Sequence, residues 1–285
     1  MNHLFKNQIA VIATQHHKEK VIAPILEKEL GVKTIVPPNF DTDIFGTFTR
    51  DIERMGNQLE AARFKALKAL EITGETIAVA TEGSFSPHRE IPFIPCHREI
   101  VIFLDIENEL EIIGQIFSTE TNYAHKIVKS VDEAWKFANQ VGFPEHGLIV
   151  MTPESDMESQ HIFKGITSES ELQSALTYII ERSPTNTAHI ETDMRAMYNP
   201  TRMKNIEKAT HDLINNIQHI CPSCSTPGFQ LSEHKKGLLC ANCYLPTSAI
   251  KSLIYKCRKC GFTEEKLFPD NLQYADPAQC LYCNP

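Results

Sequence analysis

The sequence predicts an α/β fold in which a mixed-sheet domain over residues 1–219 is followed by a small cysteine-rich module over residues 220–285. Short apolar runs alternate with segments of helical periodicity in the larger region, which is typical of an α/β domain. A hairpin expected between residues 99 and 117 adds antiparallel strands, so the sheet is expected to be mixed. Eight of the nine cysteines lie after residue 220, and they set the second region apart.

The first half of the larger region predicts three strands and two helices. Gly31 and Gly74 follow the two helical segments and are typical of helix ends. Pro24 lies inside the first of these segments and predicts a kink or a fresh helix start. The expected strands are residues 8–14, 33–36 and 76–81, the expected helices are the segment ending at Leu30 and residues 58–72, and residues 38–55 are expected to form a long loop.

The second half adds the hairpin, two further strands and three helices. Ser130 with Glu133, and Ser168 with Glu171, match the capping box that begins a helix. Asn199-Pro200 predicts the start of the last helix, because proline is favoured at the first helical position. The expected strands are residues 99–106, 110–117, 147–151 and 187–191.

Composition limits the class of protein. The chain has 285 residues, of which 42% are hydrophobic and 22% charged, as in ordinary globular proteins. No apolar run approaches the roughly 18–20 residues of a membrane-spanning helix, so no membrane partner is expected. The N-terminus lacks a basic segment followed by an apolar one, which favours a cytoplasmic protein.

Charge is divided unevenly between the two regions. Residues 1–219 carry 21 Lys and Arg against 31 Asp and Glu, whereas residues 220–285 carry 7 against 5. An acidic surface repels polyanions, so the larger region is not expected to bind nucleic acid. In the smaller region, four thiolates around each divalent ion would cancel the slight positive excess. Binding of nucleic acid or protein there is therefore only a weak expectation, and Lys256, Arg258 and Lys259 are expected to be solvated.

The eight late cysteines form four Cys-x-x-Cys hooks, whose spacing predicts metal binding. Two residues between cysteines let a tight turn direct both sulfur atoms to one point, and two hooks supply a tetrahedral Zn²⁺ site. Such all-cysteine sites have no open position, so both zinc ions are expected to be structural. The hooks are Cys221 with Cys224, Cys240 with Cys243, Cys257 with Cys260, and Cys280 with Cys283.

Other chemistry for these cysteines is less favoured. A disulfide framework would suit a secreted domain, and the sequence shows no export signal. Four regular pairs exceed what a thiol shuttle needs, and an iron–sulfur cluster would use the same thiolates. The pairing of hooks stays open: sequential pairing gives two zinc ribbons in tandem, whereas pairing first with third and second with fourth gives a cross-braced module.

Three expected strand ends in the larger region carry polar side chains. Ligands of open α/β sheets bind beyond the carboxyl ends of strands, so these residues are the candidate site. The first end carries Thr14, His16, His17 and Lys18, the second carries Glu82, Ser84 and His88, and the third carries Glu191, Asp193, Arg195, Asn199 and Arg202.

The third strand end suggests a metal and an anion site. Glu191 and Asp193 alternate along an extended segment, so both carboxylates can face one side and suit Mg²⁺. Asn199 can cap the following helix, where Arg195 and Arg202 could bind phosphate or carboxylate. The competing interpretation is a structural ion pair between Arg195 and one of the two acids.

Nucleophilic catalysis is not expected from the remaining candidates. Ser84 and His88 lack the glycine pattern of a nucleophile elbow, which argues against a serine hydrolase. Cys96 precedes His97 in a proline-rich connection, and a lone cysteine there is usually a small buried apolar residue.

Several motifs resemble an uncharacterised bacterial family, known as a domain of unknown function with a cysteine-rich tail. The likeness spans nearly the whole chain and brings no established activity. Gln15 and His17 replace the Met and Gly of the family pattern, so His16 is the motif histidine. The matching motifs are Ala13-Thr14 with His16 and Lys18-Glu19, Gly46-Thr47-Phe48 with Glu53-Arg54, Glu82-Gly83-Ser84-Phe85, Pro87-His88, Thr121-Asn122, the run from Glu191 to Met203, and the four hooks.

The order of elements around Ala-Ala-Arg-Phe-Lys-Ala, residues 61–66, is distantly similar to the inosine-triphosphate pyrophosphatases. That family uses Mg²⁺ and a carboxylate-activated water to cut nucleoside triphosphates. The resemblance implies that Lys18 contacts phosphate and that Glu82 holds metal or water, with Asp51 or Glu53 as a further carboxylate. Thr81-Glu82 stands where that family has paired acids.

Two functions of different classes follow. The first is a Mg²⁺-dependent phosphohydrolase acting on a nucleotide or small phosphate ester. Its catalytic residues would be Glu82, Glu191 and Asp193, and its substrate-binding residues His16, Lys18, Ser84, His88, Arg195, Asn199 and Arg202. The alternative is a non-catalytic adaptor whose zinc ribbons dock a protein or nucleic acid.

Overall fold

The structure is a computed structural model that describes residues 3–40, 56–88, 91–153 and 161–285. The chain forms two compact units, the first of Met1–Asp105 and Ile113–Leu213, the second of Ile106–Ile112 and Ile214–Pro285. The expected α/β class, with a mixed sheet and cysteine clusters near the C-terminus, is confirmed.

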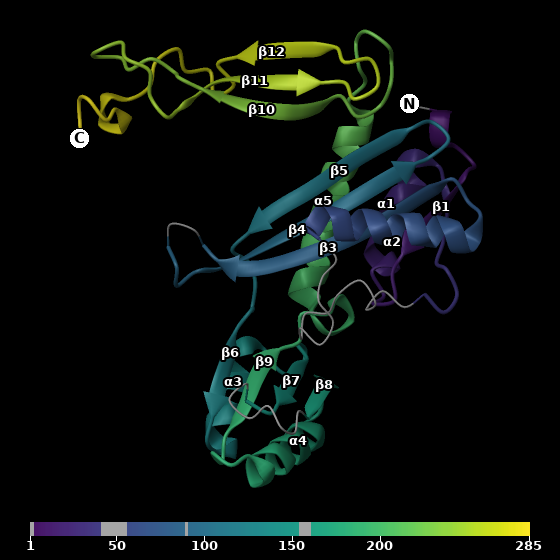
Figure 1. Cartoon of the computed structure of the whole chain (residues 1–285), viewed down its shortest axis with the longest axis vertical. Helices are drawn as coiled ribbons and strands as arrows, with labels where there is room; N and C mark the ends of the chain where they lie inside the picture. The colour runs from purple at the N-terminus through teal and green to yellow at the C-terminus, as the bar shows by residue number, and fades with distance from the viewer. Residues whose placement is uncertain (1–2, 41–55, 89–90, 154–160) are drawn as a thin grey trace. The chain divides into compact units, whose positions relative to one another are not determined.

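A five-stranded mixed sheet positions the candidate site (Figure 1). Strand β1 runs parallel to both β2 and β3, whereas β4 runs antiparallel to β3. The chain leaves β1 for β2 on one side and returns to β3 on the other, so the strand order reverses at β1. In order across the sheet the strands are β2 (Lys33–Ile35), β1 (Ile9–Ala13), β3 (Ile77–Pro87), β4 (Pro95–Asp105) and β5 (Leu110–Ser118).

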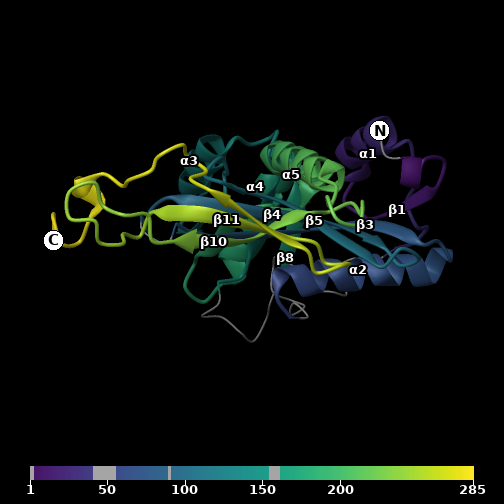
Figure 2. The same ribbon diagram turned by 90° about the horizontal axis from the view of Figure 1, so that it is seen from above.

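Helices α1 (Glu19–Leu30) and α2 (Gln58–Thr73) cover opposite faces of this sheet, as Figure 2 shows. Pro24 lies within α1, which runs on as a single helix. Helix α2 begins at a capping box of Asn57 and Glu60 and buries a row of alanines against the sheet. Small alanine side chains let this helix approach the strands closely.

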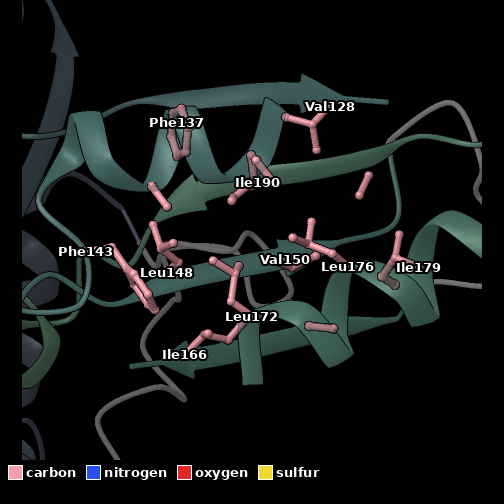
Figure 3. Packing of buried hydrophobic residues seen from close by; sticks show 14 of the residues in the cluster. Val128, Phe137, Phe143, Leu148, Val150, Ile166, Leu172, Leu176, Ile179 and Ile190 are labelled. Atoms are coloured by element: carbon pink, nitrogen blue, oxygen red, sulfur yellow. The ribbon is translucent and has the colours of Figure 1, made fainter. Parts of the chain in front are cut away.

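The first unit contains a second sheet that the sequence did not predict, all antiparallel in the order β6-β9-β7-β8. Its core is apolar and packs against helices α3 (Val131–Val141) and α4 (Glu169–Arg182) (Figure 3). Both helices begin at the serines expected, Ser130 and Ser168. The strands are β6 (His125–Val128), β7 (Leu148–Met151), β8 (Ile162–Ile166) and β9 (Ala188–Thr192).

Helix α5 (Pro200–Gln218) begins where Asn199-Pro200 predicted it. The Asn199 side chain accepts a hydrogen bond from the backbone of Arg202 at 2.9 Å and so caps the first turn. Short 3-10 helices occur at His3–Phe5, Ala196–Tyr198 and Pro277–Gln279. No helix in the described part of the chain combines the length and apolar character needed to cross a membrane.

The second unit contains a three-stranded antiparallel sheet, drawn in Figure 1 as β10 (Gln230–Lys236), β11 (Ile250–Lys256) and β12 (Thr263–Leu267). Strands β10 and β12 bury almost no side chain. The buried cluster found here consists of Phe229 with two of the cysteines. An apolar core of that size cannot hold such a sheet together, so another stabilising element is required.

Candidate functional site

Buried polar side chains gather where β1 ends beside β3, which runs on to Pro87, so the expected strand end at Glu82 is replaced by the middle of a longer strand. Ala13 pairs with Ala80 in parallel register, which brings Thr14 beside Thr81 at the switch point of the strand order. Lys18, at the start of α1, donates from Nζ to Thr81 Oγ1 at 2.7 Å and to its carbonyl oxygen at 3.4 Å. The side chain of Lys18 is buried, although its described partners are a hydroxyl and a carbonyl.

An ion pair between Lys65 and Glu82 lies next to this lysine. Lys65 projects from the alanine-lined face of α2, and its Nζ contacts Glu82 Oε1, both side chains being almost fully buried. Gln58, also on α2, donates to the carbonyl oxygen of Glu82 at 2.6 Å and to that of Arg98 at 2.9 Å. Helix α2 therefore fixes both the side chain and the backbone at this point of β3.

A second ion pair joins β4 to α5. Arg202 donates to Glu99 from Nε at 3.1 Å and from Nη2 at 3.3 Å, and from Nη1 to the carbonyl of Met194 at 2.6 Å. His97 Nε2 lies 2.7 Å from Glu99 Oε2, while its Nδ1 lies 2.9 Å from Asn205 Nδ2. The amide nitrogen can only donate, so Nδ1 of His97 accepts from Asn205 and Nε2 donates to Glu99.

Gly83 is required between these two ion pairs. A Cβ at this position would lie 2.7 Å from Arg202 Nη2 and 2.7 Å from Glu99 Oε2. Any side chain here would displace the buried guanidinium–carboxylate pair, which explains the Glu-Gly order in the motif. We call Lys18, Lys65, Glu82, Glu99 and Arg202 the charged cluster.

The electrostatics of the charged cluster favour an anion. Burial, followed by the positive charge of Arg202, lowers the pKa of Lys18 to about 7. Burial, followed by the charges of Lys18 and Arg202, lowers the pKa of His16 to about 2, so this imidazole is neutral. Burial tends to raise the pKa of Glu99, but Arg202 and the His97 hydrogen bond outweigh it and hold the pKa below its usual range. Three cations therefore face two carboxylates.

Four of the predicted site residues come together here: His16, Lys18, Glu82 and Arg202. Arg195 contributes to the positive charge acting on His16, but its own hydrogen bonds go to Asp193, at 2.6 Å from Nη2. The Asp193 carboxylate also accepts from the backbone of Gly165 at 3.0 Å. The alternative interpretation of Asp193 and Arg195 as an ion pair thus matches the geometry.

The remaining predicted residues have contacts elsewhere. Glu191 accepts from His189 at 3.1 Å on β9. Ser84 pairs with Arg98 in the β3–β4 ladder. His88 contacts the backbone of Ile91 and the ring of Phe117. Among the described residues, Glu82, Glu191 and Asp193 do not form a group of metal-ligand atoms within 4.8 Å of one another.

Some candidates lie outside the described residues, namely Asp51, Glu53 and the motif Gly46-Thr47-Phe48. His17 lines a pocket of about 440 Å³ at the carboxyl ends of β1 and β2. The other residues lining it are Thr14, Gln15, Glu19, Val36, Pro37, Asn39 and Phe40.

Sequence reasoning missed Lys65, His97, Glu99 and Asn205. Lys65 stands between Ala61 and Ala69 at helical spacing, which marks a lysine on the buried face of α2. His97 and Glu99 alternate on β4, so both point to the same side of the sheet. These patterns were visible in the sequence, but the partners were not. Arg202 and Glu99, for example, are 103 residues apart in the chain.

The eight cysteines form two groups of four in the second unit, and the pairing is interleaved. The first group joins the first and third hooks, and the second joins the second and fourth. Of the two arrangements that the sequence left open, the structure therefore has the cross-braced one. The groups are Cys221, Cys224, Cys257 and Cys260, and Cys240, Cys243, Cys280 and Cys283.

The sulfur geometry fits a bound metal ion. Sγ atoms of opposite hooks lie 3.7 and 3.6 Å apart in the first group and 3.8 and 3.6 Å apart in the second. A tetrahedron with metal–sulfur bonds of about 2.3 Å has edges of about 3.8 Å. A disulfide would need about 2.05 Å. Each group could therefore hold one metal ion.

Comparison with known proteins gives a family match and a weak structural likeness. A family model described as "Domain of unknown function (DUF6671)" matches residues 65–285. No curated protein matches the chain. A solved structure, protein VC0702 from Vibrio cholerae, is 9% identical over 73% of this chain and 94% of that chain, with a TM-score of 0.30. That score is too low to carry an argument, and none of these matches supports the resemblance to inosine-triphosphate pyrophosphatases.

Proposed function

The chain belongs to the DUF6671 family, a domain of unknown function, and we propose that its charged cluster binds the phosphate of a small molecule. The observation that carries this proposal is Lys18, a buried ammonium group held by the Thr81 hydroxyl beside the guanidinium of Arg202. A buried positive charge is costly unless it is paired. An anion entering here would supply that partner and raise the pKa of Lys18 again.

The position and chemistry of the cluster favour phosphate. Ligands of open α/β sheets bind where the strand order reverses, which is the place where Lys18 lies. The hydroxyls of Thr14 and Thr81 supplement the lysine and arginine as hydrogen-bond donors. Lys and Arg are standard phosphate ligands in proteins.

We extend the proposal to hydrolysis of a nucleotide or small phosphate ester with Mg²⁺. We assign the metal or the water to Glu82, whose ion pair with Lys65 would have to open, because Glu99 is held by both Arg202 and His97. A role for Glu191 and Asp193 would require their contacts with His189 and Arg195 to open. Lys18 and Arg202 would stabilise the charge that develops on the phosphoryl group.

A substrate screen on purified, metal-replete protein tests this function. We expect Mg²⁺-dependent release of phosphate or pyrophosphate from at least one nucleotide or sugar phosphate. Lys18→Met should abolish the activity, whereas Lys20→Met, an exposed lysine of the same helix, should not. Failure of a broad panel of phosphate compounds to react, with the protein shown to be folded, would reject the hydrolase.

For the second unit we propose structural Zn²⁺ in both cysteine groups. Four thiolates in a closed tetrahedron match the preference of structural zinc, and they leave no position for a substrate. Elemental analysis of untagged protein should find two zinc ions per chain. Detection of disulfides by mass spectrometry, or of iron in place of zinc, would contradict the proposal.

An adaptor role is the second candidate, and a group of exposed apolar side chains near the second cysteine group supports it. Leu281 is 79% exposed and Tyr282 is 71% exposed. The only charged side chains in residues 268–285 are Asp270 and Asp276, which favours a protein partner over nucleic acid. A co-purified partner lost in Leu281→Ser/Tyr282→Ser but retained in Lys18→Met would favour this role. Retention in both variants would oppose it.

A further inference from the structure

A pocket of about 440 Å³ opens where the turn from β1 into α1 meets the segment that follows β2. Small-molecule sites typically have volumes of roughly 300–1,000 Å³, so this pocket is large enough for a ligand. One side of it comes from Thr14, Gln15, His17 and Glu19, and the other comes from within residues 36–40. Both sides follow strands that meet at the reversal of strand order, where open α/β sheets bind ligands.

The pocket and the charged cluster share the turn between β1 and α1. His17 and Glu19 line the pocket, and Lys18 between them belongs to the charged cluster. Thr14 also lines the pocket, and it stands beside Thr81, whose hydroxyl accepts a hydrogen bond from Lys18. Lys18 is the N-cap of α1 and forms no capping hydrogen bond with its side chain, so the first N–H groups of the helix favour an anion. A small molecule with its anionic group on Lys18 would therefore have its uncharged part beside the pocket.

The polar lining of the pocket suits hydroxyl groups better than a second anion. It comprises a carboxylate, two amides and a hydroxyl, and the described residues that line the pocket include neither lysine nor arginine. The carboxylate repels another negative charge, whereas the amides and the hydroxyl can each donate and accept hydrogen bonds. The four groups belong to Glu19, Gln15, Asn39 and Thr14.

Glu19 and Thr14 are the residues best placed to bond the hydroxyls of a ligand. Glu19 Oε1 lies 3.5 Å from His17 Nδ1, which holds the carboxylate at the pocket. An ionised carboxylate has two accepting oxygens, so it can accept from two adjacent hydroxyls of one ligand. Thr14 is 3% exposed, and its Oγ1 accepts from the backbone N–H of His16 at 3.1 Å, which leaves its hydroxyl hydrogen to donate.

Apolar side chains complete the side of the pocket that follows β2. They are Val36, Pro37 and Phe40, of which Phe40 is buried and Val36 is 40% exposed. A sugar has hydroxyls along its edge and C–H groups on its ring faces, so it can bond the polar side and pack on the apolar side. A purely apolar ligand would leave the buried polar groups without partners, which is costly.

We propose that this pocket binds the sugar of a phosphorylated ligand, either a free sugar phosphate or the ribose of a nucleotide, through two adjacent hydroxyls on Glu19. The placement of the phosphate on Lys18 and Arg202 rests on the function proposed above, whereas the sugar pocket does not. Both ligand classes share a phosphorylated sugar with a vicinal diol. The inference therefore selects these compounds over phosphate esters of simple alcohols.

Calorimetric titration with ribose 5-phosphate, AMP, 2′-deoxy-AMP and inorganic phosphate, in buffer without Mg²⁺, tests the proposal. Wild-type protein should bind ribose 5-phosphate and AMP more tightly than inorganic phosphate. Loss of the 2′-hydroxyl in 2′-deoxy-AMP should weaken binding relative to AMP about 10-fold to 100-fold, the range for hydrogen bonds to a charged group. The tighter of ribose 5-phosphate and AMP identifies the ligand class.

Glu19→Gln tests the diol contact. It should remove most of the difference between AMP and 2′-deoxy-AMP, because the amide has one accepting oxygen and no charge. Binding of inorganic phosphate should be no weaker than in wild type. Glu29→Gln changes an exposed glutamate of the same helix and should have no effect on any ligand.

Val36→Trp tests the pocket independently of Glu19. The larger side chain fills the pocket from its exposed edge, so the variant should remain folded. Ribose 5-phosphate should then bind no more tightly than inorganic phosphate. Lys18→Met should instead weaken all the phosphate ligands.

The outcomes distinguish the sugar pocket from the phosphate site. Binding of inorganic phosphate with no added affinity for ribose 5-phosphate or AMP would reject the sugar pocket alone. Equal affinities for AMP and 2′-deoxy-AMP, or an unchanged preference in Glu19→Gln, would also overturn it. If no phosphate compound bound, saturation-transfer NMR with ribose would decide. Ribose binding that Val36→Trp removes would keep the pocket and reject the phosphate site, and absence of ribose binding would overturn both.

Discussion

The two units contain their polar clusters for opposite reasons. In the first unit, Lys18 at the start of α1, Glu99 on β4 and Arg202 on α5 are buried beside a sheet that packs through apolar side chains, and buried ion pairs add little to stability. In the second unit, strands β10 and β12 are almost wholly exposed, and the cysteines themselves form the buried centre. Buried charges are a cost to a fold, so we proposed a function for the first cluster. Metal bound by the cysteines would stabilise the second unit, so we proposed a structural role for the second cluster.

Removal of metal should produce the largest effect and should be confined to the second unit. Binding of structural Zn²⁺ contributes on the order of 10 kcal/mol to the folding of small cysteine modules. A chelator should therefore unfold β10, β11 and β12 and leave the five-stranded sheet intact. Hydrogen exchange followed by mass spectrometry would show loss of protection over residues 230–267 alone. If residues 230–267 stayed protected after complete removal of metal, the second unit would not depend on metal for its fold.

Two double variants test the interleaved pairing. Cys224→Ser/Cys257→Ser alters a single cysteine group and should leave one metal ion per chain. Cys224→Ser/Cys243→Ser alters both groups and should leave none. Sequential pairing of the hooks would give the reverse result, so metal content alone decides between the two arrangements.

Loss of the Glu99 carboxylate should be the most damaging change in the charged cluster. Glu99→Ala leaves the buried guanidinium of Arg202 without its partner, and breaking a buried pair costs about 3–5 kcal/mol. Urea unfolding at saturating metal, followed by fluorescence of the single tryptophan, Trp135, measures the loss.

Glu120→Ala provides the matched control for this change. Glu120 pairs with Lys208 on the surface, where both side chains are more than half exposed. Its removal should cause no measurable change, because exposed pairs contribute little. A loss for Glu99→Ala no larger than that of the control would show that the buried pair is not held as described.

Lys18→Met should have the opposite effect to Glu99→Ala: it should raise the free energy of unfolding by a few kcal/mol near pH 7. The folded-state pKa of Lys18 is lowered to about 7 from its usual value, chiefly by burial, so the folded protein carries the full cost of the charge below pH 7. As pH rises above 7 the folded state releases the proton before the unfolded state does, and the cost declines.

The gain from Lys18→Met should therefore shrink as the pH rises from 7 toward 10. Thermal unfolding of both proteins across this range measures it. A variant less stable than wild type at pH 7 would show that Lys18 supports the fold, and the contrast between the two units would lose its main example.

The limits of the sequence reasoning follow from the range of the interactions. Capping at Ser130, Ser168 and Asn199, and the metal hooks, depend on residues a few positions apart, and the sequence predicted all of them. The sequence predicted β7 and β9 of the second sheet but missed β6 and β8, which are only four and five residues long, β6 being mostly exposed.

The candidate site was predicted only in part, for a related reason. Lys18, Glu82 and Arg202 were identified because polar residues at strand ends and helix starts carry a local signal. Their partners Lys65 and Glu99 lie inside a helix and a strand, where a charged residue ordinarily marks the solvent face. Only the tertiary pairing shows that these charges are buried, and no local pattern encodes which distant residue compensates them.

The acid sensitivity of the first unit should be the smallest of these effects, and it depends on His16. Burial and the charges of Lys18, Arg202, Arg195 and Lys65 lower the pKa of His16 to about 2 from 6.5. Below pH 6.5 the unfolded chain takes up a proton that the folded chain does not, so stability falls as the pH falls. At pH 5 the loss from this residue is about 2 kcal/mol.

His16→Gln should remove this part of the pH dependence, because glutamine does not titrate. Urea unfolding of the metal-saturated protein between pH 5 and 7 should show a shallower slope for His16→Gln than for wild type. His161→Gln, at an exposed histidine, should keep the wild-type slope. Identical slopes for wild type and His16→Gln would mean that His16 becomes protonated in the folded state. In that case, more negative charge would have to act on His16 than the two carboxylates of the charged cluster supply.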